Sequence, residues 1–424
     1  MSELSFMEKL LDGAEVEWKA LEEVCDFKNG FAFKSSLFKE SGLPIVRITN
    51  VDGKNINLSD VKYFDPSDYR ENTASYKVCK GDILIAMSGA TTGKIGFYSH
   101  ENPAYLNQRV GKFLPKLETL NNRYLYHYLL SKVEKIYVIA GGGAQPNLSS
   151  SALMEKIKIP VPFPDNPAKS LEIQAEIVRI LDTFTELTAE LTAELSLRKK
   201  QYNHYRDQLL SFEEGEVEWK KLDEVSKKIS SGGTPRTGIS EYYDGSIPWL
   251  RTQEIDFREI WDTGVKITEA GLKNSSAKWI PENCVIVAMY GATVGKVGIN
   301  KISMATNQAC ANIDLDDRVV NYRYVFHYLT SEYEYIKSLG TGSQTNINAQ
   351  IVKSLKVPIP YANDPEKSLA EQARIVTILD KFDTFTTSIS EGLPREIELR
   401  QKQYEYYRDL LLSFPKSEKR GSLI

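Results

Sequence analysis

Apolar residues recur at helical spacing over a long stretch in the middle of the chain, from Pro167 to Phe212. Steps of three and four residues place such side chains on one stripe of a helix. At a rise of about 1.5 Å per residue, this helix would be about 70 Å long. It is therefore predicted to be a spacer whose stripe packs against a partner, rather than one of two ordinary core helices. The residues of the stripe are Ile173, Ile177, Ile180, Leu181, Phe184, Leu187, Leu191, Leu195, Tyr202 and Leu209.

Two segments of this region are repeated later in the sequence. Leu355 to Phe382 matches Ile157 to Phe184 at 15 of 28 positions, and Leu399 to Phe414 matches Leu197 to Phe212 at 12 of 16. A period near 200 residues is too long for a solenoid and indicates two similar domains. If the repeats are related by a closed two-fold, their long helices pack antiparallel.

The segments between the helical stretches are short β-prone runs separated by Gly, Pro, Asn and Asp. Each copy adds one helix, at residues 122–133 and 322–335, and then a glycine-rich loop and two short proline-edged strands. We predict an α+β fold: two similar, mostly-β domains joined by two long antiparallel coiled-coil helices, as a pseudo-two-fold tandem repeat. The expected boundaries are 1–160 and 213–358 for the domains, 161–212 and 359–414 for the helices, and 415–424 for a polar, disordered tail.

The two long helices are not equal in length. Phe184 and Leu197 are 13 positions apart, whereas Phe382 and Leu399 are 17 apart, and the extra residues include Gly392-Leu-Pro394. A proline in a helix interior removes a hydrogen bond and clashes with the preceding turn. The second helix is therefore predicted to be kinked or restarted near Pro394.

Composition is that of a globular protein, with 424 residues of which 42% are hydrophobic. The sequence has no apolar run long enough for a membrane span, and residues 1–13 lack the features of a signal peptide. We expect a cytoplasmic protein without a membrane partner. Four scattered cysteines suggest buried free thiols, and neither a disulfide framework nor a metal site is expected: Cys25, Cys79, Cys284 and Cys310.

The formal net charge of -4 argues against a protein that coats nucleic acid indiscriminately. Charge is uneven, however: residues 25–160 hold 18 Lys and Arg against 12 Asp and Glu, and residues 226–358 hold 15 against 13. Two mildly basic domains on acidic helices are compatible with local DNA contact but do not require it.

Catalytic motifs do not emerge from the sequence. Gly89-Ala-Thr-Thr-Gly-Lys94 has three residues between its glycines where a phosphate loop has four, and Ile95 stands where Mg²⁺ binding needs Ser or Thr. No amino-methyltransferase tetrapeptide, nuclease carboxylate cluster or nucleophile elbow is found. The chain is expected to be non-catalytic and to hold no cofactor of its own.

Shared and unshared residues predict different roles. A residue identical in both copies cannot by itself distinguish two different half-sites, so shared cations suit phosphate contact or the fold, and base reading belongs to unshared stretches. Amides of the glycine-rich loops could pair with adenine or tie the loop to the backbone, and both alternatives stay open. The shared candidates are Arg47, Arg251, Lys94, Lys296, Gln145, Asn147, Gln344 and Asn346; the unshared ones are Lys34, Asn50, Lys54, Asn57 and Arg70, then Arg236, Gln253, Arg258 and Lys273.

Two variable domains, each followed by proline-edged strands and a long helix ending Leu-Arg-x-Lys-Gln-Tyr-x-x-Tyr-Arg-Asp, resemble the specificity subunit of type I restriction-modification systems. The resemblance spans essentially the whole chain. It implies two target-recognition domains that each read half of a bipartite, asymmetric site in double-stranded DNA. It also implies two methyltransferase subunits and restriction subunits as partners, which supply the S-adenosylmethionine, ATP and Mg²⁺ chemistry. The alternative is a non-catalytic coiled-coil adaptor or scaffold protein.

The helix between the domains contains a tetrad repeat, Thr188-Ala-Glu-Leu191 followed by Thr192-Ala-Glu-Leu195. One more tetrad would lengthen the helix by about 6 Å, nearly two base-pair steps of about 3.4 Å. We expect helix length to set the spacer between the two half-sites.

Overall fold

The computed structural model describes residues 15–143, 146–213, 215–340, 346–387 and 392–414. Its contacts divide the chain into two compact units. Unit 1 comprises Met1–Leu191 and Ile397–Ile424, and unit 2 comprises Thr192–Glu396. Each unit therefore combines one globular domain with parts of two long helical segments.

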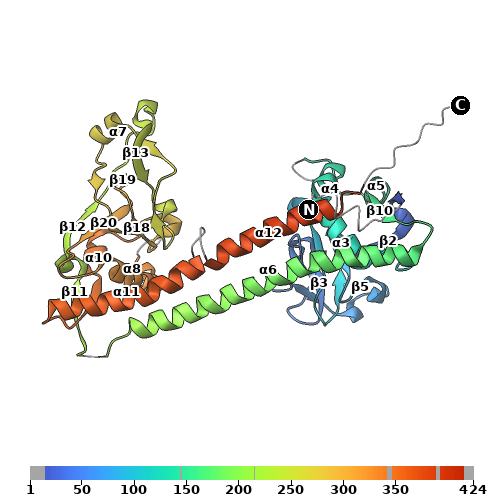
Figure 1. The fold of residues 1–424 in the computed structure, drawn as a ribbon, viewed down its shortest axis with the longest axis horizontal. Helices are drawn as coiled ribbons and strands as arrows, with labels where there is room; N and C mark the ends of the chain where they lie inside the picture. Colours follow the sequence, from blue (N-terminus) through green and yellow to red (C-terminus); the bar gives the residue numbers. More distant parts are fainter. Residues whose placement is uncertain (1–14, 144–145, 214, 341–345, 388–391, 415–424) are drawn as a thin grey trace. The chain divides into compact units, whose positions relative to one another are not determined.

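Unit 1 begins with a mostly-β domain (Figure 1). Its strands and helices are β1 (Val16–Ala20), α2 (Leu21–Val24), β2 (Cys25–Asn29), β3 (Leu43–Val46), β4 (Lys62–Phe64), β5 (Lys77–Val78), β6 (Ile83–Ala86), β7 (Ile95–Phe97), β8 (Ala104–Leu106), β9 (Val110–Pro115), α3 (Asn122–Leu130), α4 (Val133–Ile139), α5 (Ser150–Lys156) and β10 (Lys158–Pro162). Short 3₁₀ helices are η1 (Ser35–Leu37), η2 (Ile48–Asn50), η3 (Pro66–Asp68), η4 (Thr73–Tyr76) and η5 (Gly89–Thr91). Helix α6 (Pro167–Leu209) follows and continues into unit 2.

Unit 2 repeats this order of elements. Its strands and α-helices are β11 (Val217–Lys221), β12 (Ser226–Ser231), β13 (Tyr243–Leu250), β14 (Glu259–Ile260), β15 (Lys266–Ile267), α7 (Glu269–Lys273), β16 (Trp279–Ile280), β17 (Val285–Ala288), β18 (Val297–Asn300), β19 (Met304–Thr306), β20 (Cys310–Leu315), α8 (Tyr322–Ser331), α9 (Tyr333–Ser338), α10 (Ala349–Ser354), β21 (Lys356–Pro360) and α11 (Pro365–Thr387). Its 3₁₀ helices are η6 (Leu222–Val225), η7 (Ser240–Tyr242), η8 (Thr252–Glu254) and η9 (Gly291–Thr293), and α12 (Gly392–Leu411) ends in unit 1.

The sheets of the two domains correspond, except that the first sheet of domain 2 has an additional edge strand, β14. Domain 1 has the orders β2-β9-β6-β7 and β4-β3-β8-β5, and domain 2 has β12-β20-β17-β18-β14 and β15-β13-β19-β16. Pairing is antiparallel except at β3 with β8, β13 with β19 and β14 with β18. The predicted α+β tandem repeat is confirmed.

A two-stranded ladder closes each domain at the point where the long helix begins. Val16 lies opposite Pro162 in the antiparallel pair β1-β10, and Val217 lies opposite Pro360 in β11-β21. The buried faces of β10 and β21 end in prolines, which suits edge strands because proline donates no ladder hydrogen bond. The chain therefore leaves each domain beside the place where it entered.

Parts of the long helices complete the core of each unit. In unit 1, Ile173, Ile177 and Leu181 of α6 are buried together with Tyr404 and Leu411 of α12. In unit 2 the corresponding residues Ile375 and Leu379 of α11 join Leu210, which directly follows α6. The apolar stripe seen in the sequence is thus buried at both ends, against a domain and the other helix.

Aromatic stacking links the two helical segments in an order that is typical of an antiparallel pair. Phe184 stacks on Tyr407 with ring centroids 5.2 Å apart and planes at 13° in unit 1. Tyr205 stacks on Phe382 at 5.4 Å and 27° in unit 2. The residue earlier in one helix meets the residue later in the other, as the repeat predicted.

Three local expectations need correction. The single helix expected at residues 122–133 is two helices, α3 and α4, and its counterpart is likewise α8 and α9. Only one proline-edged strand precedes each long helix, because residues 150–156 and 349–354 are helical. Cys79 is exposed, whereas Cys25, Cys284 and Cys310 are buried free thiols, and burial raises the pKa of Cys25 to about 12. The tail 415–424 lies outside the described residues.

The second helical segment is two helices, as the proline predicted. Helix α11 ends at Thr387 and α12 begins at Gly392, with Pro394 in its first turn. Gly392 has a φ of +75°, in the left-handed region that only glycine adopts at little cost. A Cβ atom there would lie 2.7 Å from the carbonyl oxygens of Thr384 and Phe385. The break is therefore built around this glycine.

We predict that Gly392→Ala lowers the free energy of unfolding by about 1–3 kcal/mol, the usual range for a strained backbone position. Chemical denaturation monitored by circular dichroism checks this. Gly238→Ala is the matched control, since a Cβ atom at Gly238 has no neighbour within 4 Å. Equal stability of the two variants would contradict the proposed role of Gly392.

Candidate functional site

The segments shared by the two repeats converge at one place in unit 1. The amide of Asn107 donates to Val46 O at 3.1 Å, and the amide of Leu148 donates to Met87 O at 2.7 Å. Thr91 Oγ1 donates to Ile48 O at 3.1 Å. These bonds join residues 46–48, around the shared Arg47, to the segments 87–91, 107–109 and 146–148, and we call this arrangement the shared junction.

Unit 2 forms the same junction from the corresponding residues. Asn307 donates to Leu250 O at 2.9 Å, and Ile347 donates to Met289 O at 3.0 Å. The 3₁₀ helices η8 and η9 also contact each other, as η2 and η5 do in unit 1. The shared text therefore builds a common framework, which places Arg47 and Asn147 in one domain and Arg251 and Asn346 in the other.

The shared cations are placed differently in the two copies. Arg47 is half-buried, and its Nε has no hydrogen-bond partner among the described residues. Arg251 Nε instead lies 3.2 Å from Glu254 Oε1. Lys94 is half-buried beside η5, whereas Lys296 Nζ lies 2.6 Å from Asp256 Oδ1. Identical residue types thus carry more unneutralised charge in the first domain than in the second.

The asparagines that follow the glycine-rich loops also differ. Asn346 Oδ1 accepts from the amide of Gly291 at 3.4 Å, a bond that ties the loop to η9. Asn147 is exposed, and its backbone N–H donates to Ala140 O at 3.3 Å. Gln145 and Gln344 lie outside the described residues.

Among the unshared candidates of domain 1, Asn50 has a structural position. It is 3% exposed, its Oδ1 accepts from the amide of Arg47, and its Nδ2 donates to the carbonyls of Asn57 and Asp60. With all of these bonds made inside the domain, its amide cannot face a base, so the expectation that Asn50 reads DNA is not supported by its geometry. Asn57 is exposed, and its Oδ1 accepts from Ser59.

The unshared lysine and arginine candidates of domain 1 are exposed. Lys34 and Arg70 are exposed, and the hydroxyl of Tyr69 accepts from the amide of Lys34 at 3.1 Å. Lys54 Nζ donates to Gln401 Oε1 of α12 at 2.7 Å, and its carbonyl accepts from the Tyr126 hydroxyl. The loop of Lys54 is therefore attached to both α3 and the second helical segment.

In domain 2 the four unshared candidates Arg236, Gln253, Arg258 and Lys273 are all exposed. Sequence reasoning missed three exposed aromatics nearby: Trp261 (62% exposed), Trp279 (49%) and Tyr290 (39%). Tyr290 occupies the position of Ser88 in a turn that otherwise differs only by Val294 in place of Thr92. This replacement of serine by an aromatic residue within shared sequence was the signal that could have identified Tyr290.

A buried histidine joins each domain to both helical segments. In unit 1, His127 Nε2 on α3 lies 2.8 Å from Asp182 Oδ1 on α6, and His127 Nδ1 lies 2.9 Å from the Tyr404 hydroxyl on α12. Because a carboxylate only accepts, neutral His127 donates from Nε2 and accepts the tyrosine proton at Nδ1. We call this arrangement the histidine clamp. Arg123 also bonds to Asp182 and completes the group.

Unit 2 repeats the clamp. His327 Nε2 lies 2.7 Å from Asp380 Oδ1 on α11, and His327 Nδ1 lies 3.4 Å from the Tyr202 hydroxyl on α6. Arg323 forms ion pairs with both Asp380 and Glu259. Each domain thus takes its aspartate from the helix that follows it and its tyrosine from the other helical segment.

The electrostatics of the first clamp are set by burial. Burial lowers the pKa of His127, and the hydrogen bond to Asp182 offsets this only in part. Burial alone would raise the pKa of Asp182, but the bonds from His127 and Arg123 outweigh it and hold that pKa below its ordinary value. A neutral histidine beside an ionised aspartate is the resulting state near pH 7.

Glutamine side chains fasten the start of each long helix in the same way. Gln174 Nε2 donates to Thr119 O at 3.0 Å, while its Oε1 accepts from the amide of Asn121 at 2.8 Å. Gln372 makes the same two kinds of bond, to Val319 and Asn321. A buried amide with satisfied donors and acceptor fixes the helix in register with the domain.

No group of three or more His, Cys, Asp or Glu side chains suitable for a metal ion occurs within the described ranges. No helix in this part of the chain combines the length and apolar character needed to cross a membrane.

Comparison with known families identifies the type of repeat. The model of the type I restriction modification DNA specificity domain matches the chain twice, over residues 14–197 and 214–399. The chain is 39% identical to the type I restriction enzyme EcoR124I/EcoR124II specificity subunit of Escherichia coli, over 99% of each chain. It is 31% identical to the EcoprrI specificity subunit of the same species, over 92% of this chain and 93% of that one.

Solved structures show the same fold at lower identity. The specificity subunit of a type I restriction-modification system from M. genitalium aligns with a TM-score of 0.57 and 16% identity. The alignment covers 96% of this chain and 98% of that one. At this identity the likeness concerns the fold alone.

The first histidine clamp predicts a pH dependence of stability. Because the pKa of His127 is lower in the folded chain, the unfolded chain binds more protons, and stability rises with pH up to about 6.5. The contribution is full above that value and declines as pH falls through the folded pKa, with a slope of at most about 1.4 kcal/mol per pH unit. His127→Gln should flatten this dependence and cost about 1–3 kcal/mol near pH 7.

Denaturation midpoints measured between pH 5 and 8 check this prediction. His204→Gln is the control, because His204 is exposed on α6. A His127→Gln protein that keeps the full pH dependence of the unmodified chain would show that another group is responsible.

Proposed function

We propose that this chain, which belongs to the family of type I restriction-modification DNA specificity subunits, reads a bipartite, asymmetric site in double-stranded DNA, each globular domain reading one half. The observation that carries the proposal is the contrast between framework and surface. The shared junction and the histidine clamp recur in both units, whereas the surface cations and aromatics differ. Equal frameworks with unequal surfaces suit two unlike half-sites.

In this proposal, shared cations contact phosphates and unshared residues read bases. Arg47, Lys94 and the exposed Lys34 and Arg70 supply positive charge on domain 1, and shared cations fit the sequence-independent part of binding. Gln253, Arg258 and exposed Trp261 belong to stretches that differ from domain 1, which favours a role in reading the half-site of domain 2. Tyr290 replaces Ser88 within a shared turn and could act in the same way.

The helical segments set the spacing in this proposal. Along α6 the tetrads of residues 188–195 stand between Asp182, which enters the first clamp, and Tyr202, which enters the second. The clamps fix each end of the spacer against its own domain. The helix between these fixed points would then determine the distance between the half-sites.

The chemistry belongs to partner subunits. Two methyltransferase subunits would dock on the helices and domains and bring S-adenosylmethionine, and restriction subunits would bring ATP and Mg²⁺. The chain itself would contribute recognition and assembly without a catalytic step or a cofactor, and it would work in the cytoplasm.

The test is a map of N6-methyladenine in the genome of a host that expresses the methyltransferase partner with or without this chain. We expect a chain-dependent motif of two unlike half-sites separated by a fixed gap. Replacing residues 226–354 with the same region of a relative should change one half-site and leave the other. A continuous motif, or methylation that is independent of the chain, would favour the adaptor or scaffold alternative.

A second prediction concerns the spacer. Inserting one Thr-Ala-Glu-Leu tetrad after Leu195 should widen the gap between the half-sites by one or two base pairs, because the helix grows by about 6 Å. It should leave both half-sites unchanged. The same methylation map measures the result, and a control insertion in the exposed loop at Gly238 should leave the gap as it was. An unaltered gap after tetrad insertion would refute the proposal that helix length sets the spacer between the half-sites.

A further inference from the structure

The residue three positions after the shared arginine differs between the two domains. In domain 1 it is Asn50, whose Oδ1 accepts from the backbone amide of Arg47 at 2.9 Å. In domain 2 it is Glu254, whose Oε1 accepts from the backbone amide of Arg251 at 3.3 Å and from its Nε at 3.2 Å. Both residues hold the backbone of the arginine. Only the glutamate also neutralises the guanidinium group.

The shared lysine of domain 2 is neutralised as well. Lys296 Nζ lies 2.6 Å from Asp256 Oδ1 and 5.7 Å from the ring centroid of Phe257. In domain 2 the two cations of the shared junction, Arg251 and Lys296, are therefore matched by two carboxylates. These four groups together carry no net charge.

Domain 1 uses the corresponding aspartate differently. Asp52 Oδ1 accepts from the backbone amides of Lys54 and Asn55 at 2.7 Å each, which closes the loop that follows η2. Lys94 runs beside this loop, since a Cβ atom at Gly53 would lie 3.9 Å from Lys94 Cδ. Within the described ranges, Lys94 nevertheless forms no ion pair.

Arg47 is not neutralised either. Its Nε is buried without a hydrogen-bond partner, and no ion pair of Arg47 is formed in the part of the chain that the structure describes. A buried donor without an acceptor is unfavourable and calls for an explanation such as a missing ligand. Two cations and one carboxylate, Asp52, leave a net positive charge at the shared junction of domain 1, where domain 2 has none.

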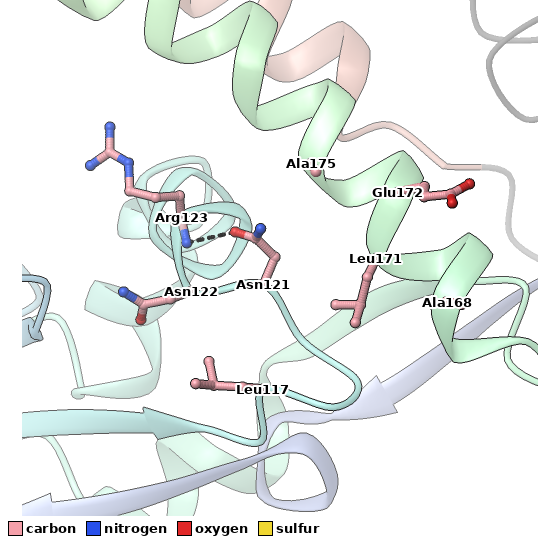
Figure 2. Close-up of a pocket in the computed structure, with 8 residues that line it drawn as sticks. All are labelled: Leu117, Asn121, Asn122, Arg123, Ala168, Leu171, Glu172 and Ala175. Atoms are coloured by element: carbon pink, nitrogen blue, oxygen red, sulfur yellow. Dashed lines mark hydrogen bonds between the residues drawn. The ribbon is translucent and has the colours of Figure 1, made fainter.

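The arginine that attaches domain 1 to α6 shows the contrast. Arg123 lines a groove beside the first turns of this helix (Figure 2). Its backbone amide donates to the Asn121 side chain at 2.9 Å, as Figure 2 shows, and its Nε donates to Asp182 Oδ2 at 3.2 Å. An arginine of unit 1 that serves the fold thus has its carboxylate. The two unneutralised cations of the shared junction are suited to an anion from outside the chain.

We propose that Arg47 and Lys94 form a site for a DNA phosphate in domain 1, and that Glu254 and Asp256 neutralise the corresponding site of domain 2. The inference rests on the proposed DNA recognition and narrows its shared phosphate contacts to one domain. The 3₁₀ helices η2 and η5 contact each other, so both cations belong to one site. Domain 1 then anchors the chain on the DNA backbone, while domain 2 depends more on contacts to bases.

The salt dependence of DNA binding tests this, with the chain in complex with its methyltransferase partner. Arg47→Ala together with Lys94→Ala should weaken binding about tenfold or more and lower the slope of log affinity against log salt by about 1.8, since each phosphate contact contributes about 0.9. The matched pair in domain 2, Arg251→Ala with Lys296→Ala, should weaken binding by at most about threefold and leave the slope nearly unchanged. Equal effects of the two pairs, in variants with unchanged denaturation midpoints, would overturn the proposal.

A gain of contact is the complementary test. Glu254→Gln keeps an acceptor for the backbone amides of Arg251 and Gly264 but removes the carboxylate charge. It should strengthen DNA binding about threefold or more and steepen the salt slope by about 0.9, because Arg251 becomes available to a phosphate. Glu282→Gln controls for the change in net charge, since Glu282 is exposed and lines a groove next to α11. Equal binding by these two variants would exclude the role of Glu254.

The same measurements separate this inference from the proposed function. A complex that binds its mapped site no better than a duplex of scrambled sequence contradicts bipartite recognition, but the phosphate site is still judged from the salt slopes of the two double variants. Specific binding with equal salt slopes for both pairs contradicts the phosphate site alone.

Discussion

The structure depends on a buried histidine that accepts one bond and donates another, each to a different helix. His127 accepts a hydrogen bond from the Tyr404 hydroxyl and donates one to Asp182, and His327 does the same with Tyr202 and Asp380. A side chain with one donor and one acceptor at a fixed angle is suited to this task, since charged histidine could not accept from tyrosine. Burial lowers the pKa of His127 and keeps the ring neutral. The packing of α3 therefore also determines that His127 donates to Asp182 and accepts from Tyr404.

Repetition of the histidine clamp explains how the two repeats keep the same attachment to the helices while their surfaces differ. The groups that hold the helices must match on three elements at once, and a change in any of them would leave a buried polar group without a partner. Surface positions such as Lys34, Arg70 and Arg258 have no such constraint. Accordingly, the buried polar side chains of the helix attachments recur in both units: His127, Ser170 and Gln174 correspond to His327, Ser368 and Gln372.

Much of the architecture could be predicted from the sequence, because internal repeats and helical periodicity can be recognised without a structure. The α+β tandem repeat, the long α6 and the break near Pro394 follow from such local or repeated patterns. The role of His127 could not be foreseen, since Asp182 is 55 residues away and Tyr404 is 277 residues away. The burial of Asn50, an unshared candidate for base reading, could not be foreseen for a similar reason: it depends on carbonyls that only the folded loop brings together. Which candidates contact DNA stays a prediction.

The composition of the two units has a consequence for the order in which the chain folds during synthesis. Unit 2 is one continuous segment, whereas unit 1 needs residues from both ends of the chain, including Tyr404, Leu411, Leu412 and Phe414 in its core. At a synthesis rate of about 5–20 residues per second, domain 1 leaves the ribosome many seconds before these side chains exist. The domain that is made first is therefore the last to be completed, and until then the apolar side chains that these residues cover in the folded chain lack their partners.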